Sequence, residues 1–167
     1  MELQTKITYL DGVRFQVTAR GHEVASDQPL ENGGADRGMT PPELLLASLG
    51  SCAAYYAAEY LRTRRLPTAG LTVSVTAQKA QKPARLTDFR IGLSVPGLDD
   101  PRHQDGILRA AKNCLIHNTL LHAPRIDIEV ENRTAKVDQS GTDREEVKSA
   151  RLERTEDVHP AERSPVG

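Results

Sequence analysis

Three observations predict an α+β fold with mainly antiparallel sheet, in the order β-β-β-α-β-β-α-β. Apolar and polar residues alternate in short runs that are separated by turn signals. Two longer segments have the apolar spacing and the caps of helices, and they separate groups of strands rather than single strands. Grouped strands pair through hairpins, which gives antiparallel sheet. The length of 167 residues suits one domain.

Residues 3–26 have the pattern of three short strands. The runs LQTKITYL and VRFQVTA are joined by Asp11-Gly12, which is a strong hairpin signal. Arg20-Gly21 marks a second turn before a third run, HEVAS. Residues 27–39 are rich in Gly, Asp and Asn and predict a loop.

The segment from Gly38 to Arg65 predicts a long central helix. Thr40 is a suitable N-cap, Glu43 completes a capping box three residues later, and Pro67 stops the helix. Apolar residues surround nearly the whole helix axis, so the helix should be covered on every side. Six short strands in one small domain would not easily cover it. We therefore expect an obligate dimer, in which a second copy of the chain covers the remaining face.

The second half of the domain again combines strands with a helix. LTVSVTAQKA and LTDFRIGLSV alternate apolar and polar residues around Lys82-Pro83 and predict two strands. An acidic cap and a proline at residues 99–101 start a second helix, which carries Cys114 on its inward stripe and ends before Pro124. The segment Ile126 to Val130 predicts a last strand.

Composition limits the classes of function. The net charge is −1 and no basic block is present, so neither nucleic acid nor a membrane surface is an expected partner. The apolar helix is too interrupted to span a bilayer and no signal-peptide pattern occurs, so we expect a cytoplasmic protein. Residues 1–132 should form the domain, and the charged residues 133–167 a disordered tail. A short helix around Glu145–Glu156 is compatible with that tail.

The two cysteines, Cys52 and Cys114, are the candidate reactive groups. In a reducing compartment a cysteine pair is more often catalytic or redox-active than a structural disulfide. A thiolate could attack a peroxide oxygen and become a sulfenic acid, which the second thiol would convert to a disulfide. Both residues could instead be small hydrophobic residues of the core. The residues alone balance these two interpretations evenly.

A reactive thiolate needs a nearby positive charge, because an ordinary thiol has a pKa of about 8.5. Arg14, Arg20 and Arg37 are the candidates, and each could equally be a solvated surface charge. Glu43 could orient such an arginine or could serve only the capping box. The histidines and cysteines lack the spacing of a metal site, and no glycine-rich phosphate loop is present. We therefore expect neither a metal nor a cofactor.

The segments GMTPPELLLASLGSCAA and RAAKNCLIHNTL, with the Asp-Gly hairpin ahead of them, resemble the OsmC/Ohr family (osmotically inducible protein C and organic hydroperoxide resistance protein). The resemblance covers roughly residues 5–130. Glu43 stands one residue later than the glutamate of the organic-hydroperoxide branch, as in the broader OsmC-like branch. The resemblance implies an intertwined homodimer, in which the sheets of both chains wrap two central helices that carry the cysteines.

The same resemblance implies a thiol-dependent, peroxiredoxin-type reduction of organic or hydrogen peroxides in oxidative-stress defence. Cys52 would be the peroxidatic cysteine and Cys114 the resolving cysteine. An N-terminal arginine such as Arg20 or Arg37, held by Glu43, would activate Cys52 at the dimer interface. A dithiol or lipoyl-type reductant would restore the thiols. Two other functions stay open, namely a non-catalytic binding protein for a small hydrophobic ligand and a redox sensor.

Overall fold

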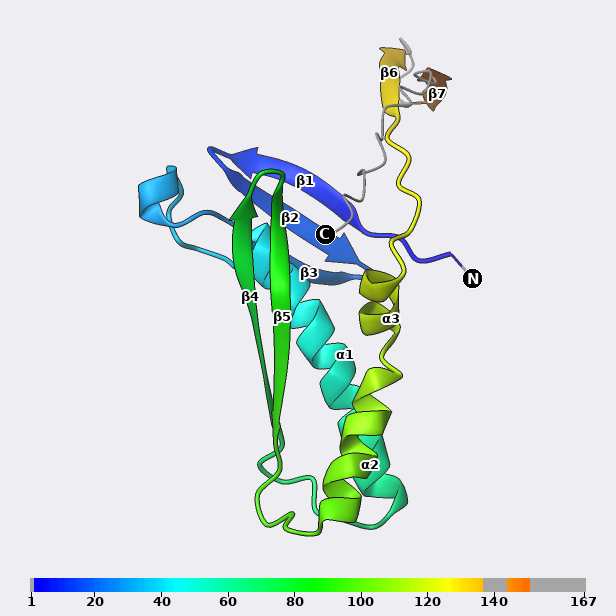
Figure 1. The fold of residues 1–167 in the computed structure, drawn as a ribbon. Helices are drawn as coiled ribbons and strands as arrows, with labels where there is room; N and C mark the ends of the chain where they lie inside the picture. The colour runs from blue at the N-terminus through cyan, green and yellow to red at the C-terminus, as the bar shows by residue number, and fades with distance from the viewer. Residues whose placement is uncertain (1, 137–143, 151–167) are drawn as a thin grey trace, which may run out of the picture. The chain divides into compact units, whose positions relative to one another are not determined.

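The computed structural model describes residues 2–136 and 144–150 (Figure 1). The chain divides into two units, Met1–Pro124 and Arg125–Gly167. Its elements are β1 (Lys6–Asp11), β2 (Arg14–Ala19), β3 (His22–Ser26), the 3-10 helix η1 (Leu30–Asn32), α1 (Pro41–Thr63), β4 (Thr72–Gln81), β5 (Ala84–Ser94), α2 (Pro101–Lys112), α3 (Leu115–Leu121), β6 (Val130–Lys136) and β7 (Arg144–Ala150). The named strands pair in antiparallel fashion, which confirms the predicted α+β class.

The N-terminal sheet is a meander in the order β1-β2-β3, as its turn signals predicted. Gly12 in the first turn, and both Arg20 and Gly21 in the second, adopt positive φ, which closes tight hairpin turns. Apolar side chains of this sheet stay accessible, among them Ile7 at 57% and Tyr9 at 62%. One copy of the chain therefore leaves apolar sheet surface exposed.

Helix α1 begins with the predicted capping box. The Glu43 N–H donates to Thr40 Oγ1 over 3.4 Å, and the Thr40 N–H donates to the Glu43 carboxylate over 2.8 Å. The larger buried side chains of the helix repeat about once per turn: Leu49, Ala53, Ala57 and Leu61. Tyr55, by contrast, is 59% exposed. A single chain thus covers one side of α1, and cover on every side would require further protein.

Strands β4 and β5 form a long hairpin that packs against α1 (Figure 1). Gly50 is buried on α1, and a Cβ there would lie 3.0 Å from Val75 Cγ2, so helix and strand approach closely. On β5, a bulge at Asp88, which has φ of 53°, sets two residues opposite one of β4. As a result Leu86 and Phe89, three positions apart, line the same cavity.

The predicted second helix is two helices, and this prediction was wrong in its detail. Asn113 ends α2, and Cys114, with φ of −57° and ψ of 127°, is the N-cap residue of α3. The His117 N–H donates to Cys114 Sγ over 3.4 Å, so the thiol itself caps the new helix. Because the apolar spacing continues across the break between α2 and α3, the sequence did not show the break. Asn and Cys are both weak helix formers, which lowers the cost of leaving the helix there.

The strand predicted for Ile126 to Val130 begins only at Val130. Ile126 and Ile128 are 78% and 82% exposed and pair with no strand among the described residues. An extended segment becomes a strand only when its backbone finds a partner. In the second unit β6 pairs with β7, so the short helix expected around Glu145–Glu156 is wrong over residues 145–150. The disorder expected for the rest of the tail falls on residues 137–143 and 151–167, outside the described residues.

A buried hydrophobic cluster joins the C-terminal half of α1 to α2. It consists of Ala57, Leu61 and Ile107. The Tyr60 hydroxyl and His103 Nδ1 are hydrogen-bonded at 3.2 Å. A Cβ at Gly106 would overlap the Tyr60 ring, so only glycine allows this approach of α2. The contact fixes α2 on α1, and with it the position of Cys114 just beyond the end of α2.

Candidate active site

The structure brings the two cysteines together. Cys52 lies on α1 and is half-buried, whereas Cys114 lies between α2 and α3 with no exposed surface. Both are free thiols, and Cys52 lies close enough to Cys114 to influence the pKa of that thiol. Solvent therefore reaches Cys52 but not Cys114.

Burial raises the pKa of the Cys114 thiol, because the surrounding protein disfavours a thiolate. The hydrogen bond with Cys52 raises the pKa further, and the His117 N–H opposes part of the effect. Cys114 therefore keeps its proton at neutral pH. The arrangement pairs an accessible cysteine with a protonated, buried cysteine beside it.

The remaining candidate residues of the site are Glu43, Arg20 and Arg37. The Glu43 carboxylate accepts hydrogen bonds from the Thr40 N–H and hydroxyl, each at 2.8 Å, and the former lowers the pKa of Glu43 most. Arg20 sits exposed in the β2–β3 turn, and Arg37 is exposed in the loop before α1. Among the described residues, no hydrogen bond or ion pair joins any of the three to Cys52.

Sequence reasoning missed Asp27, which organises the loop over residues 27–39. Asp27 is 2% exposed. Its carboxylate accepts hydrogen bonds from the backbone N–H groups of Gln28, Ala35 and Arg37 at 2.8, 3.2 and 3.0 Å. The Asp27 N–H donates to the Met39 carbonyl, which closes the loop just before α1. An aspartate before a turn-rich segment is a weak signal, because partners eight and ten residues away do not show in sequence.

Arg14 is the N-terminal arginine that the protein holds in place. It donates to the Asp11 carboxylate, and its charge contributes to the low pKa of Asp27. Its Nε is buried and has no hydrogen-bond partner among the described residues. Arg14 and Arg37 both line a polar pocket of about 270 Å³ beside Asp27.

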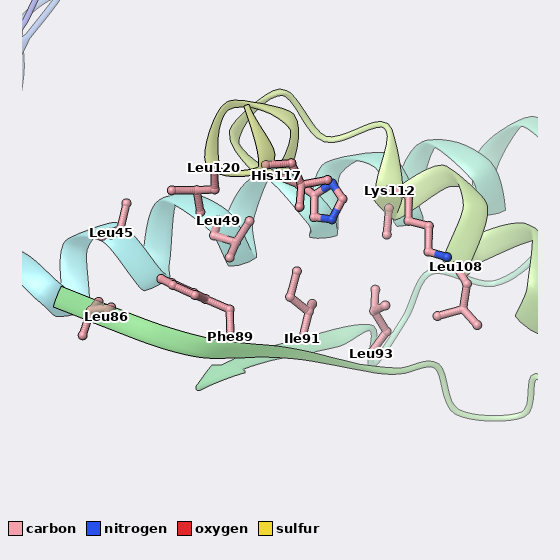
Figure 2. A pocket seen from close by; sticks show the side chains of 12 residues that line it. Leu45, Leu49, Leu86, Phe89, Ile91, Leu93, Leu108, Lys112, His117 and Leu120 are labelled. Carbon is pink, nitrogen blue, oxygen red and sulfur yellow. The ribbon is translucent and has the colours of Figure 1, made fainter. Parts of the chain in front are cut away.

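A larger, apolar cavity of about 590 Å³ lies between β5 and the three helices (Figure 2). It is lined by Leu45, Leu49, Leu86, Phe89, Ile91, Leu93, Leu108, Ala111, Lys112, His117, Leu120 and Leu121. Tyr55 and Tyr56 of α1 do not line this cavity, and their rings pack edge to face at 5.4 Å. His117 connects the cavity with the thiols, since its side chain lines the cavity and its N–H donates to Cys114 Sγ.

Two negative findings apply to residues 2–136 and 144–150. No group of three or more His, Cys, Asp or Glu side chains there could hold a metal ion. Within the same ranges, no helix combines the length and the apolar character needed to cross a membrane.

These features define a class: an α+β protein in which a central helix holds one thiol against a second, buried thiol. The family profile described as OsmC-like protein matches residues 33–129, more than half of the chain. The chain belongs to the OsmC-like protein family, as the resemblance of its motifs indicated. No curated protein sequence matches it.

Solved structures share the fold. A candidate osmotic stress induced and detoxification response protein from Psychrobacter arcticus 273-4 is 26% identical, with 69% of this chain and 85% of that chain covered and a TM-score of 0.64. An OsmC-like protein from Mycoplasma pneumoniae is 16% identical, with coverages of 74% and 89% and a TM-score of 0.64. An organic hydroperoxide resistance protein from Elizabethkingia anophelis is 20% identical, with coverages of 74% and 91% and a TM-score of 0.57.

The unequal burial of the two thiols predicts unequal alkylation. With iodoacetamide at pH 7.5, Cys52 should be modified at least about tenfold faster than Cys114, because reaction needs an accessible thiolate. Peptide mass spectrometry of samples quenched over time measures both rates. In unfolded protein the two rates should converge. Equal rates in the folded protein would contradict the burial of Cys114.

Asp27 should stabilise the fold in a pH-dependent manner. The hydrogen bond from the Arg37 N–H lowers its pKa most. A folded-state pKa below the unfolded value, about 3.9, gives stability that is present above that value and is lost as pH falls through the folded pKa. Asp27→Asn should therefore lower the melting temperature by several degrees at pH 7, and the difference should shrink in acid.

Thermal unfolding between pH 7 and pH 3 measures this effect. Asp36→Asn, in the same loop but exposed and with φ of 54°, is the matched control and should change little. A constant difference between Asp27→Asn and the parent at all pH values would argue against the charged carboxylate as the stabilising group.

Proposed function

We propose that this protein is a thiol-dependent peroxidase that reduces organic or hydrogen peroxides through Cys52 and Cys114. The observation that carries the proposal is the contact between an accessible Cys52 and a buried, protonated Cys114. Membership of the OsmC-like family, and likeness in fold to organic hydroperoxide resistance proteins, support it. A role in defence against oxidative stress follows from that activity.

The proposed cycle has three steps. The Cys52 thiolate attacks one peroxide oxygen, the O–O bond breaks, and the departing alkoxide takes a proton to leave as an alcohol. Cys52 is then a sulfenic acid. The Cys114 sulfur attacks the Cys52 sulfur, water leaves with the hydroxyl and the thiol proton, and a disulfide forms. A dithiol of the lipoyl type supplies two electrons and two protons and restores both thiols.

The raised pKa of Cys114 suits the resolving role. A protonated, buried thiol does not compete with Cys52 for peroxide, and it meets the sulfenic acid as soon as that forms. The rapid disulfide protects Cys52 from further oxidation. We assign Cys52 as the peroxidatic cysteine on this basis.

A homodimer is part of the proposal for two reasons. A single chain leaves an apolar surface exposed, and it leaves the candidate site incomplete. Tyr55 on α1 and Ile7 and Tyr9 on the N-terminal sheet are more than half exposed. Within one chain no described cation contacts Cys52, so the activating arginine would come from the second copy. Arg20 and Arg37 are exposed and form no ion pair among the described residues, and Glu43 would orient whichever serves. We assign the protein to the cytoplasm, where dithiol reductants are available.

Stopped-flow measurement of tert-butyl hydroperoxide consumption with dihydrolipoamide tests the activity. The parent should turn over, and Cys52→Ser should fall to the uncatalysed rate, because the attacking sulfur is gone. Cys114→Ser should consume about one equivalent of peroxide per chain quickly and then slow, since no disulfide forms. Ser51→Ala, an exposed neighbour on α1, should match the parent. Equal turnover by the parent and Cys52→Ser would refute the proposal.

A further inference from the structure

Cys114 has a structural role besides its proposed redox chemistry, because its sulfur caps α3. The residue is the N-cap of that helix, and the His117 N–H donates to Cys114 Sγ over 3.4 Å. The N–H groups of Ile116 and His117 both lower the pKa of the thiol, so both lie close to the sulfur. The first N–H groups of a helix have no partner within the helix, and a capping side chain supplies one.

Helix α3 is otherwise weakly held. It has only seven residues, and none of them is buried. Leu115 and Leu121 are 61% and 65% exposed. A helix this short is marginal on its own, so its stability comes from its packing contacts and from its cap. Loss of the cap should therefore open α3 and leave the longer, better packed α1 in place.

A disulfide between the two cysteines would move the Cys114 sulfur. The bond requires sulfur atoms about 2.05 Å apart, which is far inside the contact distance of two free thiols. Cys52 can contribute little of this movement, because it lies in the middle of α1 between Leu49 and Ala53, which are buried. Cys114 lies between two helices with non-helical backbone angles, so it can turn without breaking a helix. The movement should therefore fall on Cys114 and carry its sulfur away from the His117 N–H.

From this geometry we propose that formation of the Cys52–Cys114 disulfide uncaps α3 and releases it, so that the helix responds to the redox state of the thiols. In the step itself, the two thiols lose two electrons and two protons to the oxidant, which is a peroxide or a diazene. The sulfur that accepted from the His117 N–H becomes bonded to the Cys52 sulfur. The inference rests on the disulfide of the proposed function, but not on peroxide as its source.

Release of α3 would change access to the buried thiol. His117 and Leu120 of α3 line the apolar cavity on the side opposite β5 (Figure 2). Cys114 has no exposed surface in the reduced protein. Opening of α3 would therefore expose the oxidised Cys114 sulfur, which an external thiol could then attack. Reduction would restore the cap and close the helix over Cys114 again.

Hydrogen–deuterium exchange of the full-length protein tests the inference. Diamide, a diazene that oxidises dithiols, converts the reduced protein to the disulfide, and a crosslinked Cys52–Cys114 peptide verifies the product. The backbone N–H groups of residues 117–121 should then exchange at least about fivefold faster, because a helix end without its cap opens more often. The N–H groups of residues 57–63 on α1 should exchange at the same rate in both states.

Substitutions separate the cap from the disulfide. Cys114→Ser keeps an N-cap acceptor, so α3 of this variant should exchange like that of the reduced parent. Cys114→Ala removes the acceptor, and its α3 should exchange like that of the oxidised parent. Cys52→Ser keeps the cap and cannot form the intramolecular disulfide, so diamide should leave its α3 unchanged.

Four results would overturn the inference. Unchanged or slower exchange of α3 in the disulfide form would show that the crosslink holds the helix in place. Faster exchange of α1 as well would show a general loosening instead of a release of α3. Equal exchange in Cys114→Ser and Cys114→Ala would show that the side chain does not cap α3. Absence of the crosslink after diamide treatment would show that the two sulfurs do not meet.

Failure of the inference can be told from failure of the proposed function. Because diamide takes the place of the peroxide, a protein that forms the disulfide and releases α3 but does not turn over peroxide would refute only the peroxidase. A protein that turns over peroxide while α3 exchanges unchanged would refute only the release of the helix.

Discussion

The packing of α2 and α3 against α1 is the constraint on which this structure depends. Gly106 lets α2 lie directly on Tyr60, and that approach ends at Asn113, where the helix breaks. Because of the break, the Cys114 side chain is buried beside Cys52, and the same turn directs His117 toward both the sulfur and the cavity. The thiol pair and the apolar cavity are thus two products of one helix junction.

Local signals in the sequence predicted most of the fold. The capping box of Thr40 and Glu43, the Asp11-Gly12 hairpin and the period-two strands depend on neighbours within a few residues, so their pattern is visible without a structure. The break at Cys114 was not visible, because apolar spacing runs through it. The exposure of Ile126 was missed for a related reason, since alternation shows a capacity to form a strand and not the presence of a partner.

The candidate site was likewise predicted only in part from the sequence. Cys52 and Cys114 were identified from residue type and motif, and the structure brings them together across helices that are distant in sequence. Asp27 was missed because its three backbone partners come close to it only in the folded loop. Arg14 is held in position by Asp11 and by that loop, which the sequence does not show either. Arg20 and Arg37 stay predictions, since their role in the proposal depends on a second copy of the chain.

The central claim is that the two thiols form a redox pair, and one measurement tests it most directly. The reduced, full-length protein is treated with one equivalent of tert-butyl hydroperoxide, and its intact mass and proteolytic peptides are determined. A redox pair predicts the loss of two hydrogens per chain and a peptide in which Cys52 is crosslinked to Cys114. An unchanged mass, or added oxygen on Cys52 without the crosslink, would contradict the claim.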